Sequence, residues 1–119
     1  DQLKEWEIIT AVAGHSIGTN SHASAYVTND YSGCICTNGF RVFNIDEKKL
    51  NPFYLLYFLK SKYFLNQVYR FRTGAAIPSL LDSDLLNILI LVPDIKEQER
   101  IGAIIKNGFA ERRKYQVQR

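Results

Sequence analysis

Several features are scarce or missing in this 119-residue chain, and each absence narrows what it can be. No apolar run approaches the ~20 residues that a membrane-spanning helix needs, and the acidic N-terminus lacks the apolar core of a signal peptide. The two cysteines, Cys34 and Cys36, would point to opposite faces of a strand, so they do not pair with each other. We therefore expect a domain of the reducing cytoplasm. The lack of Met and the abrupt polar start indicate a piece of a longer chain.

The motifs of common catalytic and cofactor sites are also missing. There is no GxxxxGK[ST] phosphate loop and no GxGxxG turn. His15 and His22 have no Cys or carboxylate near them at metal-ligand spacing, and Ser16 beside His15 lacks the context of a nucleophile elbow. Residues 51–54 (NPFY) resemble a methyltransferase Asn-Pro-Pro-Tyr motif but lack its second proline. The sequence therefore favours a binding domain without catalytic residues, a cofactor or a metal.

The positive charge is small in total but concentrated in two stretches. The chain is 46% hydrophobic and 23% charged, as in ordinary globular domains, and its net charge is +3. Residues 41–73 hold seven Lys and Arg against Asp46 and Glu47, a net charge of +5, and residues 100–119 hold six against Glu111, another +5. A charge run is often only a solvated face, so this clustering permits nucleic-acid binding without demonstrating it.

Short runs rich in β-branched and apolar residues predict strands. They cover residues 6–13, 25–28, 34–37 and 40–45, and an Asn-Gly pair predicts a hairpin turn between the last two. The apolar run 87–92 (NILILV), ended by a proline, predicts a central strand buried on both faces.

A helix is predicted next, with Asn51 as its N-cap and Pro52 at its first position. It extends from Phe53 to about Tyr69 and carries an apolar stripe at helical spacing. The stripe consists of Leu55, Leu56, Leu59, Tyr63 and Gln67. The aromatic residues Tyr57, Phe58 and Tyr63 are expected in the core rather than as platforms for stacking bases.

A second helix is predicted at the end of the chain, where Asp94 and Glu97 have capping-box spacing. Its apolar stripe, which typically packs on its own domain or on another helix, consists of Ile101, Ile104, Ile105 and Phe109. The predicted fold is thus α+β: a small twisted β-sheet with a packed amphipathic helix, followed by a C-terminal helix that begins a coiled-coil-like spacer. Residues 1–93 would form the first unit and residues 94–119 the start of the spacer.

Residues 71–105 closely resemble the C-terminal part of a target-recognition domain in type I restriction–modification specificity subunits. That part has a Thr-Gly-x-x-Ile-Pro-x-Leu loop, an Asp-Leu turn, an aliphatic strand ending in Pro, and a helix opening with Glu-Gln and Ile. The matching positions here are Thr73, Gly74, Ile77, Pro78, Leu80, Asp84, Leu85, Ile88, Ile90, Pro93, Glu97, Gln98 and Ile101. Residues 14–18 and 52–59 resemble the family more loosely.

The resemblance implies that the domain docks into the DNA major groove and selects one half of a split target. In that family, long helices set the distance between the halves and bind methyltransferase subunits, which carry S-adenosylmethionine, while restriction subunits carry ATP. The chain itself would then need no cofactor. A full specificity subunit resembles two such domains, whereas this chain has one. The recognition region of a fused restriction–methylation enzyme, a protein-interaction module and self-association through the C-terminal helix stay open.

The candidate contact residues fall into three groups. The phosphate-contacting candidates are Lys60, Lys62, Arg70 and Arg72, followed by Arg41. The base-edge candidates, which share one polar loop, are His15, Ser16, Asn20, Ser21 and His22, and Thr73 suits either role. The candidates for binding a partner protein are Ile101, Ile105, Phe109, Arg112 and Arg113.

Overall fold

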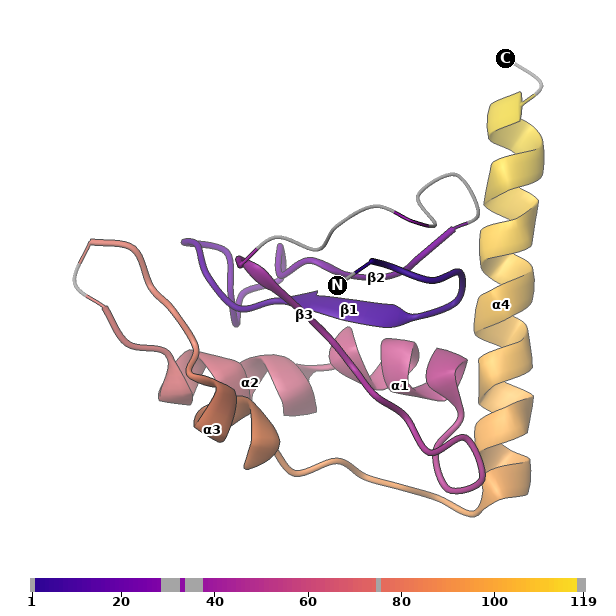
Figure 1. The fold of residues 1–119 in the computed structure, drawn as a ribbon. Helices are drawn as coiled ribbons and strands as arrows, with labels where there is room; N and C mark the ends of the chain where they lie inside the picture. Colours follow the sequence, from indigo (N-terminus) through magenta and orange to yellow (C-terminus); the bar gives the residue numbers. More distant parts are fainter. Residues whose placement is uncertain (1, 29–32, 34–37, 75, 118–119) are drawn as a thin grey trace.

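The computed structural model describes residues 2–28, 33, 38–74 and 76–117, with side chains as far as residue 109. Within these residues the chain forms a three-stranded sheet and four helices, so the α+β prediction is confirmed (Figure 1). In order, the elements are β1 (Ile8–Ala11), β2 (Ser24–Tyr26), β3 (Phe40–Val42), α1 (Pro52–Leu59), α2 (Lys62–Phe71), α3 (Asp82–Leu86) and α4 (Ile95–Val117).

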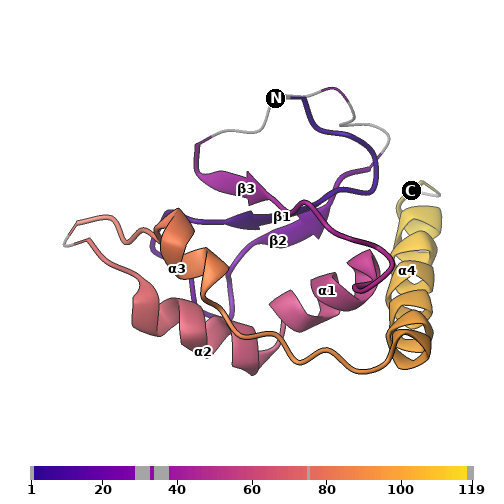
Figure 2. The ribbon, with the colours of Figure 1, turned by 60° about the horizontal axis from the view of Figure 1, so that its bottom comes forward.

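The sheet has the order β2-β1-β3, and both pairs are antiparallel. Ile9 of β1 lies opposite Ala25 on one side and Val42 on the other. Helices α1 and α2 follow one another, roughly end to end, on the same side of the sheet (Figure 2). The buried Ile8 and the apolar residues of these two helices form the core between the layers.

The strand predictions succeed for the three strands of the described sheet, with β3 inside the predicted strand 40–45. The predicted strand 6–13 contains β1, and the predicted strand 25–28 overlaps β2. Of the predicted hairpin, residues 34–37 lie outside the described residues, while β3 pairs with β1.

The single helix predicted from Phe53 to Tyr69 is wrong, because the chain breaks it at Lys60 and Ser61. Ser61 has extended backbone angles (φ −83°, ψ 157°), and its hydroxyl donates to the Phe58 carbonyl at 2.6 Å. The residues that the two helices give to the core cluster explain the break, since in one continuous helix the two sets would face roughly half a turn apart. These residues are Leu55, Leu56, Phe58 and Leu59 in α1, and Phe64, Leu65 and Val68 in α2.

The break moves part of the predicted stripe to the surface. Tyr63, expected in the core, is 67% exposed, and Tyr57 is also exposed, whereas Phe58 is buried as expected. Gln67 lies at the edge of the buried face and bonds to the backbone of Leu89.

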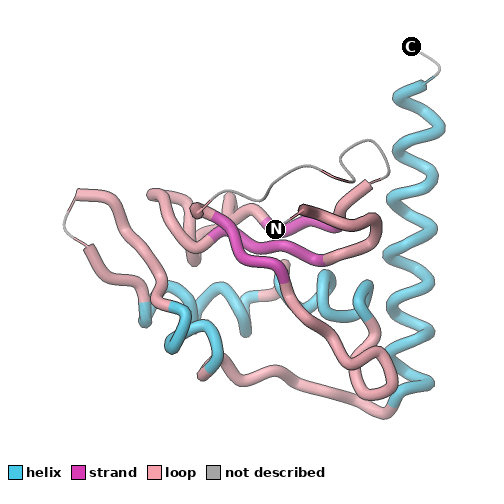
Figure 3. Tube along the Cα trace, viewed as in Figure 1, coloured by secondary structure: helices cyan, strands magenta, loops and turns pink. Residues whose placement is uncertain are grey.

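The central strand predicted for residues 87–92 is wrong as well, because this segment is a loop that passes below α1 and α2 to reach α4 (Figure 3). Side chains replace the strand ladder: the Gln67 amide bonds to both the N–H and the carbonyl of Leu89, at 2.8 and 2.9 Å. The Tyr54 hydroxyl donates to the carbonyl of Leu91. Ile88 and Ile90 pack on the core, while Leu89 is 78% exposed. The apolar run 87–92 is therefore buried on one face, whereas the strand prediction requires burial on both.

Helix α4 begins where predicted, with the Asp94 carboxylate accepting the N–H of Glu97 at 2.9 Å. It packs against α1 through Gln98, which is 1% exposed. The Gln98 side-chain oxygen accepts the N–H of Asn51 at 2.8 Å, and its NH₂ group donates to the carbonyls of Lys49 and Pro93. A polar clamp thus joins the start of α4 to the N-terminus of α1.

Two further contacts fix α4 on the domain. Gly102 lies so close to the side chain of Asn51 that a Cβ atom there would overlap it. Two turns further towards the C-terminus of α4, the Phe109 ring packs on Tyr26 of β2 with the ring centroids 4.9 Å apart. Ile105 and Phe109, predicted to bind a partner protein, both pack against the core of their own domain, while the side chains of Arg112 and Arg113 lie outside the described residues.

Candidate nucleic-acid interface

The β1–β2 loop runs antiparallel beside α2, and its contacts begin at the C-terminal end of that helix. The Arg72 guanidinium donates to the carbonyls of His15 and Ile17, at 3.4 and 3.2 Å. Gly18 lies so close to the backbone of Tyr69 that a Cβ atom would sit 2.7 Å from the Tyr69 nitrogen. The loop therefore follows α2 at a distance that only glycine permits.

The remaining contacts continue towards the N-terminal end of α2. The His22 ring meets Phe64 edge-on, with centroids 5.5 Å apart. The Lys60 ammonium, just before α2, donates to the carbonyl of Ser24 at 2.6 Å. These four contacts follow one another along both segments, so residues 15–24 lie antiparallel to residues 60–72. The polar loop and the helix therefore form one continuous surface.

A second loop extends this surface beyond the end of α2. Thr73 and Ser79 exchange two backbone hydrogen bonds, at 2.8 and 2.6 Å. The carbonyl of Pro78 accepts the N–H of Gly14 at 2.9 Å, so this loop is tied to the start of the β1–β2 loop. Thr73 is exposed there, beside Arg72.

The predicted cations are not equivalent. Lys62 and Arg70 are exposed, and neither makes a hydrogen bond or ion pair with the residues that the structure describes. Arg72 stacks on the Tyr69 ring, 4.0 Å from its centroid, in addition to holding the loop. Lys60 is tied to Ser24, and burial of its ammonium lowers its pKa.

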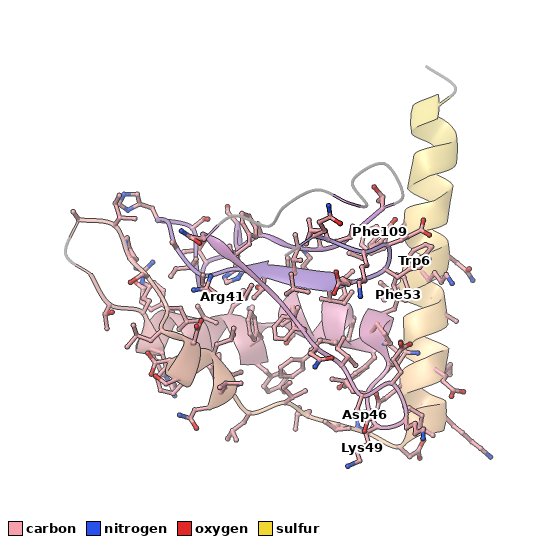
Figure 4. The ribbon with its side chains drawn as sticks, in the orientation of Figure 1. Trp6, Arg41, Asp46, Lys49, Phe53 and Phe109 are labelled. Carbon is pink, nitrogen blue, oxygen red and sulfur yellow. The ribbon has the colours of Figure 1, made fainter. Side chains whose placement is uncertain are left out.

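Arg41 lies apart from the other predicted cations. It belongs to β3, at the edge of the sheet opposite to β2, and its Nε atom lies 2.7 Å from the Asp82 carboxylate (Figure 4). The polar loop and Lys60 lie at the β2 side. The structure therefore brings four of the five predicted cations to α2 and leaves Arg41 at a different edge.

His22 is the base-edge candidate that the structure does not bring to the surface. It is 5% exposed, its Nε2 atom lies 2.9 Å from the Thr10 hydroxyl, and its Nδ1 atom accepts the N–H of Gly18 at 2.9 Å. Burial, and then the charge of Lys60, lower the pKa of His22 to about 4. It therefore holds the loop as a neutral ring, and a polar loop sequence gives no signal of such burial.

The other base-edge candidates remain accessible. His15, Asn20 and Ser21 are exposed, and Ser16 is half-buried. Sequence reasoning missed Asn66 and Tyr69, which are exposed on α2. The sequence carries no local signal for them, because they are turned away from the core by the break at Ser61, which depends on how the two helices pack.

The described residues contain no group of three or more His, Cys, Asp or Glu side chains that could hold a metal ion. A cleft of about 680 Å³ lies elsewhere, between the N-terminal segment, residues 43–47 and α4. Its lining holds the carboxylates of Glu5, Glu7, Glu47 and Glu99 against the ammonium groups of Lys4 and Lys106, and this net negative charge disfavours a phosphate group.

A family model described as the type I restriction modification DNA specificity domain matches residues 8–117. The chain belongs to this family. The match extends from β1 to the last described residue of α4, so it includes α2 and both loops beside it. No curated protein matches the chain.

Membership identifies the chain as a DNA target-recognition module of a restriction–modification system, and such specificity domains are non-catalytic. The resemblance noted in residues 71–105 is thereby confirmed. None of the helices in the described part of the chain is long and apolar enough to cross a membrane.

Proposed function

We propose that this specificity domain binds double-stranded DNA in a sequence-dependent way and selects one half of a split target. The observation that carries the proposal is the side-by-side arrangement of α2 and the β1–β2 loop. Lys62 and Arg70 project from α2 without a partner among the described residues, next to a loop whose exposed side chains offer donors and acceptors. Phosphate contacts position a protein on a duplex, and base-edge contacts select the sequence.

Each group of candidates then takes one role. Lys62 and Arg70 contact phosphates. Arg72 and Lys60 hold the loop, and their charges add to the positive electrostatic potential of the surface. The exposed members of the polar loop reach base edges, with Thr73 at their border; these members are His15, Ser16, Asn20 and Ser21. His22 acts as a support for the loop, and Arg41 contributes at most a flanking contact.

Membership of the family supports a proposal for the assembly. The domain joins methyltransferase subunits and, through them, restriction subunits, in the cytoplasm, and it brings no cofactor of its own. Residues 1–93 recognise DNA, while α4 starts the spacer, with its exposed side free for a partner helix. Ile104 is 60% exposed on that side. A fused restriction–methylation enzyme would use the domain in the same way.

The proposal is tested by the double substitution Lys62→Glu and Arg70→Glu. We expect DNA affinity in the complex with the methyltransferase subunits to fall roughly 10- to 100-fold, because two phosphate contacts become repulsive, and the dependence of affinity on salt to become shallower. The matched control is Lys48→Glu with Lys96→Glu, which makes the same charge change at exposed positions near the start of α4.

A mobility-shift titration at several salt concentrations measures both quantities. Equal affinities for the double variant, the control and the unchanged protein would contradict the proposal. If the double variant instead lost the methyltransferase subunits and kept its DNA affinity, the surface would be a protein-interaction site.

A further inference from the structure

The outer face of α2 carries a straight polar stripe. Lys62, Asn66 and Arg70 follow one another at intervals of four residues, so they lie along one side of the helix. All three are exposed. Tyr63 and Tyr69 flank the stripe with 67% and 53% of their surface exposed. The buried residues of α2 lie on its opposite side, so this stripe faces away from the core.

The side-chain amide of Asn66, at the middle of the stripe, is not used in the contacts within the domain. It makes no hydrogen bond with the residues that the structure describes. The neighbouring amide of Gln67 is fully engaged by the Tyr63 carbonyl and the backbone of Leu89. Asn also lowers the helix propensity of this short helix relative to Ala or Gln. Neither packing nor helix stability therefore accounts for Asn66.

The charges beside Asn66 also differ from those of an ordinary solvated helix. The sequence contains no Asp or Glu from residue 48 to residue 81, although it holds six Lys and Arg there. On α4, by contrast, Arg100 pairs with Glu97 at 2.5 Å, as cations on surface helices commonly do. The cations of α2 have been left without neighbouring carboxylates, which suits a polyanionic partner.

The spacing of the stripe matches the dimensions of duplex DNA. Eight residues of α-helix separate Lys62 from Arg70, a rise of about 12 Å, which is close to the width of about 12 Å of the major groove. A helix that enters the groove with this face can reach phosphates with its two end cations. Asn66, at the midpoint, then faces the base edges.

We propose that Asn66 is a specificity-determining residue that reads an adenine in the major groove. Its side-chain NH₂ group donates to N7 of the base, and its carbonyl oxygen accepts from the N6 amino group, the pairing that suits Asn and adenine. Lys62 and Arg70 hold the helix in the groove. The inference rests on the proposed function, and it adds α2 to the polar loop as a second reader of the sequence.

The test is a selection from randomised duplexes by the chain assembled with its methyltransferase subunits, as the unchanged protein and as Asn66→Ala. We expect the unchanged protein to select a motif that includes an A·T pair which Asn66→Ala no longer prefers. The preference at that one position should fall roughly 5- to 100-fold, with the other positions retained. Asn107→Ala, an exposed amide on α4, is the matched control and should leave the motif unchanged. Thermal unfolding should give neither variant a lower Tm than the unchanged protein, because Ala favours a helix more than Asn does.

Three results separate this inference from the proposed function. If the unchanged protein selects a motif and Asn66→Ala selects the same motif with equal strength, Asn66 does not read a base, while the proposed function stands. If Asn66→Ala weakens all sites equally, Asn66 contacts the backbone and the inference is also overturned. If the unchanged protein selects no motif, the proposed function itself fails.

Discussion

At the junction of α1 and α4, the Gln98 amide is 1% exposed and bonds to three backbone groups, whereas on the outer side of α2 the Asn66 amide is exposed and bonds to none of the described residues. The charged neighbours differ in the same way. Arg100 on α4 is paired with Glu97, but Lys62 and Arg70 on α2 have no such partner in the described part of the chain. One region uses its polar groups to hold the domain together, and the other leaves them available to a ligand.

The aromatic residues follow the same division. Near α4, the Trp6 ring stacks on Tyr26 with centroids 5.3 Å apart, and the Lys106 ammonium lies 4.9 Å from the centroid of Trp6 (Figure 4). Trp6 has a φ of +73°, which is rare for a bulky residue, so these contacts offset a strained backbone. On α2, Tyr63 projects into solvent instead. Substitutions should therefore affect folding at one end of the molecule and binding at the other.

The largest loss of stability is expected for Gln98→Ala. The change leaves the partly buried N–H of Asn51 without an acceptor and opens a cavity where the buried Gln98 side chain packs between α1 and α4. An unsatisfied buried group costs about 1–3 kcal/mol and a cavity adds to this, so we expect unfolding to become easier by about 3–5 kcal/mol. Urea unfolding monitored through the single Trp measures the difference.

Two controls test the cause of that loss. Gln98→Leu restores most of the volume but no hydrogen bond, so it should remain destabilised if the polar clamp matters. Lys96→Ala changes an exposed residue of the same helix, two positions before Gln98, and should alter the free energy of unfolding little. A Gln98→Leu protein as stable as the unchanged one would mean that packing alone joins α4 to the domain.

The clamp also illustrates what a sequence can reveal. The caps at Asn51 and Asp94 were predictable because the signal is local, and both side chains accept the backbone N–H groups expected of them. The break at Ser61 was not predictable from one apolar stripe, since it depends on where two helices meet the same sheet face. For residues 87–92, the sequence showed apolarity but not the side chains that take the place of a neighbouring strand.

The candidate surface was predictable to a similar degree. Basic residues near α2 and a polar loop were evident in the sequence, but their alignment depends on contacts between distant positions, from Lys60 with Ser24, 36 residues apart, to Arg72 with Ile17, 55 residues apart. Burial of His22 depends on Thr10 and Phe64, which are distant in sequence as well. Local composition therefore identifies which residue types are present, and only the fold decides which of them face a ligand.

A smaller, pH-dependent loss is expected from His22, which belongs structurally to the folded interior although it lies in the candidate binding loop. Its pKa is lowered to about 4 in the folded chain from an ordinary 6.5, so the unfolded chain takes up the proton first as the pH falls. The stabilisation from the neutral ring is complete above pH 6.5 and disappears as the pH falls towards 4. We expect stability to decrease by about 2 kcal/mol between roughly pH 7.5 and pH 5.

Urea unfolding across that pH range checks this expectation. In His22→Gln the decrease should be largely absent, whereas in His15→Gln, which changes the exposed histidine of the same loop, it should persist. A decrease that survives in His22→Gln would assign the pH dependence to other groups.

The smallest effect is expected at the ion pair of Arg41 with Asp82. This pair tests whether β3 belongs to the part of the molecule that stabilises the fold or to the part that binds DNA. The Nε–Oδ1 distance is 2.7 Å, but the two side chains remain 41% and 67% exposed. Water and salt screen such a pair, so a double-mutant cycle of Arg41→Ala and Asp82→Ala should give a coupling energy of about 0–1 kcal/mol that declines at high salt. A coupling above about 2 kcal/mol would mean that this edge of the sheet is held by its charges, as α4 is held by Gln98. A weak coupling leaves Arg41 able to exchange Asp82 for a phosphate at little cost, and DNA affinity of the Arg41→Ala protein then decides whether β3 extends the binding surface beyond α2.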